Sequence, residues 1–220
     1  HAIPAADTDP QNGVPDYAEN VTAKLDETWK TLIEEDGFRP PLDDSEHHDR
    51  PDYGGDARFD VYLQNIEDND GYRVVEACQS NPPQCAGYLV MENDFKGFGY
   101  PTKERGIKVL TSHEFMHAIH GAYLAGIPRF WSEGTATWAE ERVFPEQTDY
   151  ENFLSVFFRS VDRPLDHDET GNLADSFPYA TAVWPTFLAQ RFDTAIIPEI
   201  FEALAQAGTE VESPDDVEFW

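Results

Sequence analysis

Two histidines and a glutamate occur in a pattern that suits metal-dependent hydrolysis. His113, Glu114 and His117 form an HExxH motif within the segment 111–121. Residues four apart lie roughly 40° apart around a helix and one turn along it, so both imidazoles can converge on one ion. Imidazole nitrogens bind zinc at about 2.0–2.1 Å. Glu114 lies beside the pair, where it can take a proton from a water that the metal activates.

A third ligand is expected from the next helix. After a break at Gly126 the chain continues into the segment 131–136, which contains Glu133. His120 lies on the same helix face as the histidine pair, but it is about 10 Å along the axis from His113. A single ion cannot easily bind both, so we interpret His120 as a packing residue or a partner of a ligand. Glu133 is therefore the predicted third ligand.

The segment Leu110–Glu141 resembles the gluzincin metallopeptidases, which pair HExxH with a later glutamate. The blocks Lys103–His117 and Trp131–Ala136 carry the resemblance, and Asn12–Tyr17 is similar to a stretch in secreted bacterial and archaeal metalloproteases. The resemblance implies Glu133 as the third ligand. It also implies a zincin-like, two-lobed fold with the cleft across the active-site helix.

The chain departs from the family pattern at one position. Many gluzincins carry an aspartate four residues after the ligand glutamate, where it orients a metal-bound histidine, but this chain has Thr137. Glu140 lies seven residues after Glu133 and therefore on the same helix face. Glu140 is one candidate for the orienting acceptor. The alternative, that Glu140 is an ordinary surface acid, stays open at this point.

Peptide hydrolysis also needs a donor for the oxyanion besides the metal. Enzymes similar to this chain often use a downstream tyrosine or histidine. We predict Tyr179 for this role, with Tyr123 and His167 as rivals. A tyrosine that only packs or caps a helix is the alternative.

The predicted substrate is a peptide or protein, and the expected reaction is that of a zinc endopeptidase. We expect the segment Gly87–Met91 to be an edge strand that pairs with an extended peptide. The stretch Val90–Asn93 resembles part of the motif with which gluzincin aminopeptidases hold a free amine, and Glu92 would then bind that amine. An aminopeptidase is thus one alternative. A non-catalytic surface or binding protein with a structural zinc is another.

The elements that must position these residues predict an α+β fold, because the strands precede the helix at 103–123 and helices follow it. We expect one peptidase domain of residues 1–220, with an N-terminal lobe of about 1–124 and a C-terminal lobe of about 125–220. Pro185 should kink or divide its helix. Strands are expected at 59–63, 72–77 and 87–91, and helices at 14–32, 103–123, 132–143, 152–161, 179–191 and 198–207.

Cys78 and Cys85 are separated by a proline-containing turn, which favours a disulfide bond between them. Disulfides form in oxidising compartments, so a secreted, extracellular protein is expected. No stretch approaches the roughly 18 apolar residues of a membrane-spanning helix, so we expect no membrane insertion.

The charge is strongly acidic, with 43 acidic residues against 15 basic ones and a net charge of −28. Such a surface repels phosphate, so a nucleic acid is not an expected partner. Salt adaptation, calcium binding and plain solubility are three explanations that composition does not separate. The oxygen-rich turns at 7–13, 68–71 and 166–168 are candidate calcium sites. The oligomeric state stays open.

Overall fold

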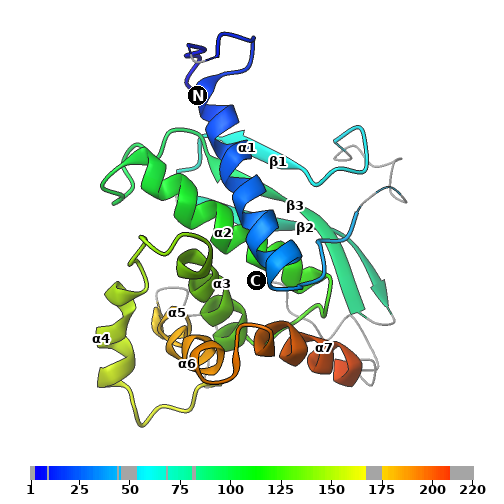
Figure 1. The fold of residues 1–220 in the computed structure, drawn as a ribbon, viewed down its shortest axis with the longest axis vertical. Helices are drawn as coiled ribbons and strands as arrows, with labels where there is room; N and C mark the ends of the chain where they lie inside the picture. Colours follow the sequence, from blue (N-terminus) through cyan, green and yellow to red (C-terminus); the bar gives the residue numbers. More distant parts are fainter. Residues whose placement is uncertain are drawn as a thin grey trace.

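The computed structural model describes residues 3–8, 10–43, 45, 54–67, 69–80, 83–166 and 175–208. A small sheet and two long helices form one part of the molecule, and shorter helices gather beyond them (Figure 1). The predicted α+β class is confirmed. Within the described ranges, no helix combines the length and apolar character needed to cross a bilayer.

The sheet has the order β1-β3-β2, with β1 at Val61–Gln64, β2 at Gly71–Ser80 and β3 at Pro83–Glu92. β3 pairs parallel with β1 and antiparallel with β2. The prediction of an edge strand at Gly87–Met91 is therefore wrong, because β3 is hydrogen-bonded on both sides. β2 is an edge of the described sheet instead.

The predicted disulfide bond crosslinks β2 and β3. Antiparallel pairing places Cys78 opposite Cys85, with their Cα atoms 4.1 Å apart, and the two sulfurs are bonded. The disulfide prediction is confirmed. The paired strands, however, extend past both cysteines, so the bond links two strands and does not close a loop between shorter ones.

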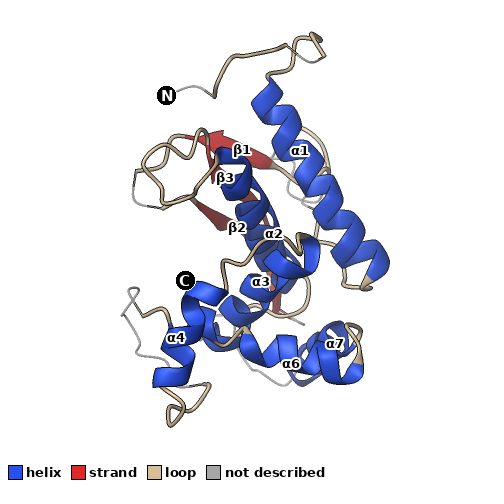
Figure 2. Ribbon diagram, turned by 60° about the vertical axis from the view of Figure 1, so that its left-hand side comes forward, coloured by secondary structure: helices blue, strands red, loops and turns tan. Residues whose placement is uncertain are grey.

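Two long helices run next to the sheet (Figure 2). α1 spans Asp16–Trp29 and continues into the π-helical segment η1 at Lys30–Glu35, while α2 spans Lys103–Gly121. α2 is buried on nearly all sides, as expected for a helix enclosed between other elements. One apolar cluster joins α1, β3 and α2 through Tyr17, Val21, Met91, Phe95, Ile107 and Leu110.

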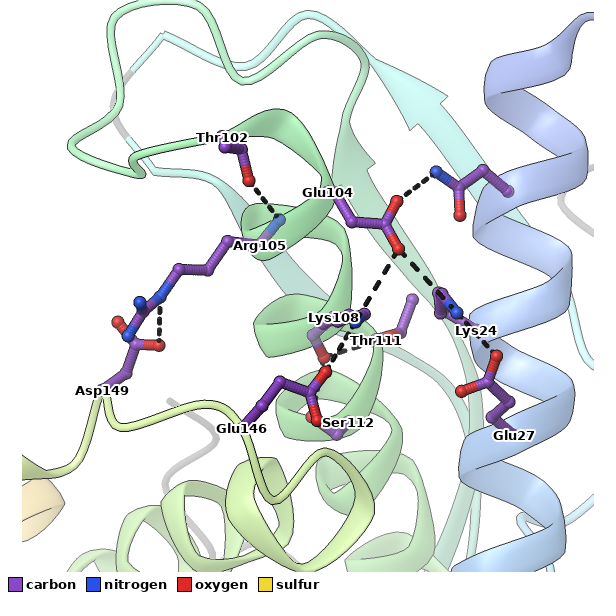
Figure 3. Close-up of polar contacts among 11 residues, drawn as sticks. Lys24, Glu27, Thr102, Glu104, Arg105, Lys108, Thr111, Ser112, Glu146 and Asp149 are labelled. Atoms are coloured by element: carbon purple, nitrogen blue, oxygen red, sulfur yellow. Dashed lines mark hydrogen bonds and ion pairs between the residues drawn. The ribbon is translucent and has the colours of Figure 1, made fainter.

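Charged side chains link the first turns of α2 to elements on both sides (Figure 3). Glu104 accepts a hydrogen bond from Asn20 of α1 at 2.5 Å and lies 3.8 Å from Lys24. Exposed pairs of this kind contribute at most about 1 kcal/mol each. The buried apolar surface of α2 is therefore its main anchor. On the other side of α2, Arg105 forms an ion pair with Asp149 at 3.0 Å, and Lys108 forms one with Glu146 at 2.6 Å.

The helices after α2 pack on its far side. α3 spans Arg129–Val143 and contacts α2 directly. The helix predicted at 179–191 is divided, and the break at Thr181 and Ala182 precedes Pro185, which lies in the first turn of α6, where proline is tolerated. The predicted lobe boundary near residue 124 falls between α2 and α3, and the division into lobes stays a prediction. The later helices are α4 at Glu151–Arg159, α5 at Phe177–Ala180, α6 at Val183–Phe192 and α7 at Ile196–Gly208.

The larger core lies between α2, α3 and α7. Its fully buried members include Met116 and Ile119 of α2, Ala136 of α3 and Phe201 of α7. Fully burying a side chain of this size stabilises the fold by about 1.5–3 kcal/mol. This core fixes α3 against the same helix that carries the histidine pair.

Candidate metal centre

α2 places His113 and His117 one turn apart, with their ring centroids 4.9 Å apart. His113 is buried, and His117 is partly buried. The two rings face the start of α3, because the core residues between α2 and α3 hold these helices in contact. The convergence that the motif predicts within one helix is therefore present.

Glu133 of α3 completes the cluster. Its Oε2 lies 3.4 Å from Nε2 of His113 and 3.5 Å from Nε2 of His117. Two ligands at about 2.0–2.1 Å from a tetrahedral ion lie about 3.4 Å apart, so these spacings fit one ion. Oε2 of Glu133 is buried and has no hydrogen-bond partner in the described part of the chain. The three residues can hold a metal ion.

The local sequence of α3 allows its close approach. Gly134 follows Glu133, and a Cβ at this glycine would lie 2.5 Å from Oγ1 of Thr181. Burial would raise the pKa of Glu133, but the nearby His117 and His113 outweigh it and hold this pKa below its usual range. The carboxylate is therefore ionised and ready to bind a cation.

Glu114 lies beside the cluster and lines the same cleft as His113 and His117. Its side chain is mostly buried, and this burial raises the pKa of the carboxyl, while the two histidines oppose the shift. A carboxylate with a raised pKa is a stronger proton acceptor than an ordinary carboxylate. Glu114 is not part of the three-residue cluster that can hold the ion.

Glu140 orients His113. Its Oε1 lies 2.7 Å from Nδ1 of His113, and its side chain is buried at 4% exposure. The alternative of an ordinary surface acid is therefore wrong. The contact leaves Nε2 of His113 free to face Glu133 and the position that a metal ion could occupy, as in many histidine–metal sites. Thr137, at the position where gluzincins carry aspartate, has no hydrogen-bond partner for its Oγ1 among the described residues.

Two hydroxyl residues of α3, Ser132 and Thr135, contact the histidines of α2, although the sequence motifs do not indicate them. Oγ of Ser132 lies 3.2 Å from Nδ1 of His117 and 3.3 Å from Nδ1 of His120. Nε2 of His120 lies 2.9 Å from Oγ1 of Thr135. His120 is therefore a partner of a ligand and not itself in the cluster, as predicted. The spacing of Ser132 and Thr135 around Glu133 was the available signal, since all three lie within one turn of a helix.

The three candidates for the oxyanion donor have different outcomes. The ring of Tyr179 stacks on His113 with centroids 5.9 Å apart, and Tyr179 lines the cleft. Tyr123 is fully buried outside the cleft, and its hydroxyl accepts a hydrogen bond from the backbone N–H of Arg39 at 2.8 Å. Tyr123 is therefore unsuitable. His167 lies outside the described residues.

Glu92 is buried within the fold and is not among the residues that line the cleft. Its side chain is 2% exposed, and Oε2 accepts a hydrogen bond from the backbone N–H of Ile66 at 2.6 Å. Oε1 accepts a further bond from the backbone N–H of Asp94 at 3.3 Å. Both carboxylate oxygens are thus used within the fold, which leaves Glu92 unsuited to hold a substrate amine.

The cleft has a volume of about 620 Å³ and is bounded by β2, α2, the start of α3 and α5. The strand at its border is β2, whose residues Gly71, Tyr72 and Arg73 contribute to the lining. Because β2 pairs only with β3 in the described sheet, its other edge is free of strand partners. β2, and not β3, is therefore the edge strand that borders the cleft.

In the described parts of the candidate calcium turns, aspartate side chains accept hydrogen bonds from protein groups. Asp7 accepts hydrogen bonds from the backbone N–H groups of Asn12 at 3.0 Å and Gly13 at 2.8 Å. Asp70 accepts a hydrogen bond from the hydroxyl of Tyr100. Asp9, Asp68, and His167 with Asp168 lie outside the described residues.

Comparison with known proteins gives no match. No family model matches the chain, and neither the curated proteins nor the solved structures include a significant relative. The chemistry of this centre is therefore argued from its own residues.

Proposed function

We propose that this chain is a zinc-dependent endopeptidase, with His113, His117 and Glu133 as the metal ligands and Glu114 as the general base. One observation carries the proposal. Two imidazole nitrogens and a buried carboxylate oxygen converge at spacings of 3.4 and 3.5 Å inside a cleft that Glu114 also lines. Nitrogen ligands favour zinc over calcium or magnesium, which prefer oxygen.

Zinc bound by these residues would lower the pKa of a water and polarise the scissile carbonyl. Glu114 accepts the proton of the attacking water and passes it to the leaving amine. The hydroxyl of Tyr179 donates to the developing oxyanion. Glu140 and Ser132 hold the rings of His113 and His117, which keeps the ligand nitrogens directed at the ion.

The geometry favours a catalytic over a structural metal. Structural zinc sites are usually closed by four protein ligands, whereas catalytic sites have three and keep one position open. The cluster in the described part of the chain has three members, and it borders a cleft. A structural zinc in a binding protein remains the second candidate function, since three ligands of this kind also bind the ion without catalysis.

An endopeptidase fits the cleft better than an aminopeptidase. Glu92, the residue proposed to bind a free amine, has both carboxylate oxygens bonded to backbone N–H groups. The free edge of β2 borders the cleft and can pair with the backbone of an extended peptide. We propose that the protein acts outside the cell, and its disulfide bond supports an oxidising setting.

The deciding experiment compares the wild type with Glu114→Gln in casein hydrolysis, together with zinc analysis of both proteins. We expect the variant to retain zinc and to lose activity by a factor of about 10²–10⁴, because only the proton acceptor is removed. Glu104→Gln, at a partly exposed position in the first turn of the same helix and outside the residues that line the cleft, is the matched control. Equal hydrolysis by Glu114→Gln and wild type would favour the non-catalytic zinc protein.

A second measurement separates the two peptidase classes. The same peptides are supplied with free and with acetylated amino termini. An endopeptidase cleaves both forms at internal bonds. Cleavage confined to the free amines would show an aminopeptidase.

A further inference from the structure

The guanidinium of Arg73 lies in the cleft, and the proposed chemistry does not use it. Arg73 belongs to the edge strand β2 and lines the same cleft as Glu114 and His117. One Nη donates a hydrogen bond to the backbone carbonyl of Cys85 at 2.7 Å. The Nε–H is buried and has no hydrogen-bond partner among the residues that the structure describes. A charged donor is thus left unused beside the catalytic groups.

This arrangement differs from that of other arginines in the chain. No described carboxylate forms an ion pair with Arg73, although the chain has 43 acidic residues. A partly buried cation with no carboxylate in contact is unfavourable, and an anion from outside would relieve it. Arginines that do pair with carboxylates are Arg39 with Glu202, Arg58 with Asp56, Arg105 with Asp149, Arg142 with Asp36 and Arg163 with Asp175.

The arginine remains charged in this position. Burial lowers the pKa of Arg73 to about 10, and the charge of Glu114 opposes the shift. At neutral pH the guanidinium is therefore a cation. Since Arg73 lines the same cleft as Glu114, His113 and His117, a short peptide bound in this cleft can contact the cation.

The last turn of α2 is shaped to accommodate the guanidinium. A Cβ at Gly121 would lie 2.3 Å from Nη2 of Arg73 and 2.5 Å from the carbonyl oxygen of Cys85. Any larger residue would therefore displace the arginine or the strand. Gly121 lies one turn after His117 and so continues the helix face that carries the metal ligands.

Apolar side chains line part of the cleft that contains Arg73. Val75 of β2 and Leu124 and Ile127 of the loop after α2 line the cleft together with Arg73 and Gly121. A planar cation beside apolar side chains suits a carboxylate on a short hydrocarbon stem, because the guanidinium fork matches the two carboxylate oxygens. Arg129 of α3 is a second arginine that lines the cleft. Glu114 and Glu133 border the same cleft, and their charges disfavour a doubly charged phosphate more than a single carboxylate.

We propose that Arg73 binds a carboxylate of the peptide substrate and so determines the specificity of the cleft. The carboxylate belongs either to an Asp or Glu side chain near the scissile bond or to the C-terminus of the peptide. This inference rests on the proposed peptidase function, because it names the substrate class of the same cleft.

The test uses one hexapeptide scaffold, acetylated at its amino terminus. Glu or Gln is placed at each position in turn, and each peptide is made with a C-terminal carboxylate and with a C-terminal amide. The zinc-loaded wild type, Arg73→Gln and Arg73→Lys are compared by kcat/KM for every peptide. Arg159→Gln is the matched control, since this exposed arginine of α4 bonds only within its own helix.

We expect the wild type to prefer one carboxylate over its amide counterpart by about tenfold or more, the value of a charge-assisted hydrogen bond. Arg73→Gln should remove that preference, and Arg73→Lys should retain part of it because the charge remains. A preference between Glu and Gln identifies a side-chain carboxylate, whereas a preference for the free C-terminus identifies the terminal one. An unchanged preference in Arg73→Gln would overturn the proposal. An equal loss of kcat/KM for carboxylate and amide peptides would also overturn it, because it would show that the arginine is purely structural.

Binding measurements separate this inference from the peptidase proposal. The same peptides are titrated calorimetrically into zinc-loaded Glu114→Gln, with and without Arg73→Gln. Carboxylate-dependent binding that requires Arg73 supports the inference. If such binding occurs but the wild type hydrolyses no peptide, only the peptidase proposal fails. Hydrolysis by the wild type without any Arg73-dependent binding would refute the inference alone.

Discussion

At the scale of single residues, Tyr179 has packing contacts and a proposed catalytic role, which a conservative substitution can separate. Its ring stacks on His113 and on Phe153, with centroids 5.9 and 5.4 Å apart. Its hydroxyl is the proposed donor to the oxyanion. Tyr179→Phe preserves both ring contacts and removes only the hydroxyl, so we expect kcat to fall about 10²-fold with little change in KM.

Steady-state kinetics on a peptide from the hydrolysis screen measures this effect. Tyr150→Phe, at a tyrosine outside the residues that line the cleft, is the control. If Tyr179→Phe retains the wild-type kcat, the tyrosine serves packing alone.

Glu140 is the second residue whose function can be isolated. One of its oxygens contacts Nδ1 of His113, and the other is buried without a hydrogen-bond partner among the described residues. Glu140→Gln keeps the size of the side chain but removes the negative charge that increases the basicity of the ligand. We expect zinc affinity to fall about 10–100-fold, measured by competition with a chromophoric chelator.

The neighbouring residue provides the comparison for this substitution. Glu141 is partly buried but does not contact His113, so Glu141→Gln should bind zinc like the wild type. Wild-type zinc affinity in Glu140→Gln would show that the contact with His113 does not tune the metal site.

At the scale of elements, the segment that carries Tyr179 is anchored by an ion pair. Arg163 Nη1 donates to Asp175 Oδ1 at 3.2 Å, and Asp175 also accepts the backbone N–H of Phe177 at 3.1 Å. The Arg163 guanidinium lies 4.2 Å from the centre of the Phe177 ring. These contacts attach the chain before α5 and therefore help to place Tyr179 against the metal centre.

The ion pair between Arg163 and Asp175 makes the free energy of unfolding depend on pH. The hydrogen bond from Arg163 holds the pKa of Asp175 below its usual range. A lowered pKa contributes stability above the unfolded pKa of about 3.9, and this contribution is lost as the pH falls through the folded value. Asp175→Asn should therefore be less stable by about 1–2 kcal/mol at pH 7, and the difference should shrink below pH 4.

Urea unfolding at pH 7 and pH 3 measures the two differences. Asp162→Asn, at an exposed position in the same segment, is the control and should behave like the wild type at both pH values. A difference for Asp175→Asn that persists or grows at pH 3 would contradict the assignment.

At the scale of the whole molecule, the net charge of −28 sets the response to salt. Like charges in excess repel one another and destabilise the compact state. The Debye length falls from about 10 Å at 0.1 M salt to 3 Å at 1 M, so added salt screens this repulsion. We expect Tm to rise between 0.05 and 1 M NaCl, measured by calorimetry or circular dichroism.

A comparison with calcium distinguishes general screening of charge repulsion from binding at a specific calcium site. Millimolar CaCl₂ is compared with NaCl at equal ionic strength. The described turns use Asp7 and Asp70 in hydrogen bonds of their own, so we expect equal Tm values. A larger rise with calcium would indicate a calcium site, and a falling Tm in NaCl would show that attractive surface pairs outweigh the repulsion.

The sequence by itself determined what depends on short stretches of chain. The spacing of His113 and His117 specifies how two side chains are placed on one helix, because helix geometry repeats every 3.6 residues. The same periodicity located Glu140 on the face of Glu133, and the short separation of Cys78 and Cys85 indicated their disulfide. The α+β class followed from the order of these patterns, because the strands precede the helix at 103–123 and helices follow it.

Only the tertiary structure decided which distant elements meet. The central position of β3 depends on hydrogen bonds with two strands, and no periodicity within one strand encodes its neighbours. The same holds for Arg73, which reaches the cleft because β2 crosses α2 where Gly121 leaves room for it. Side chains from different elements converge through the packing of many residues, so spacing along the chain could not reveal that Arg73 lies near Glu114.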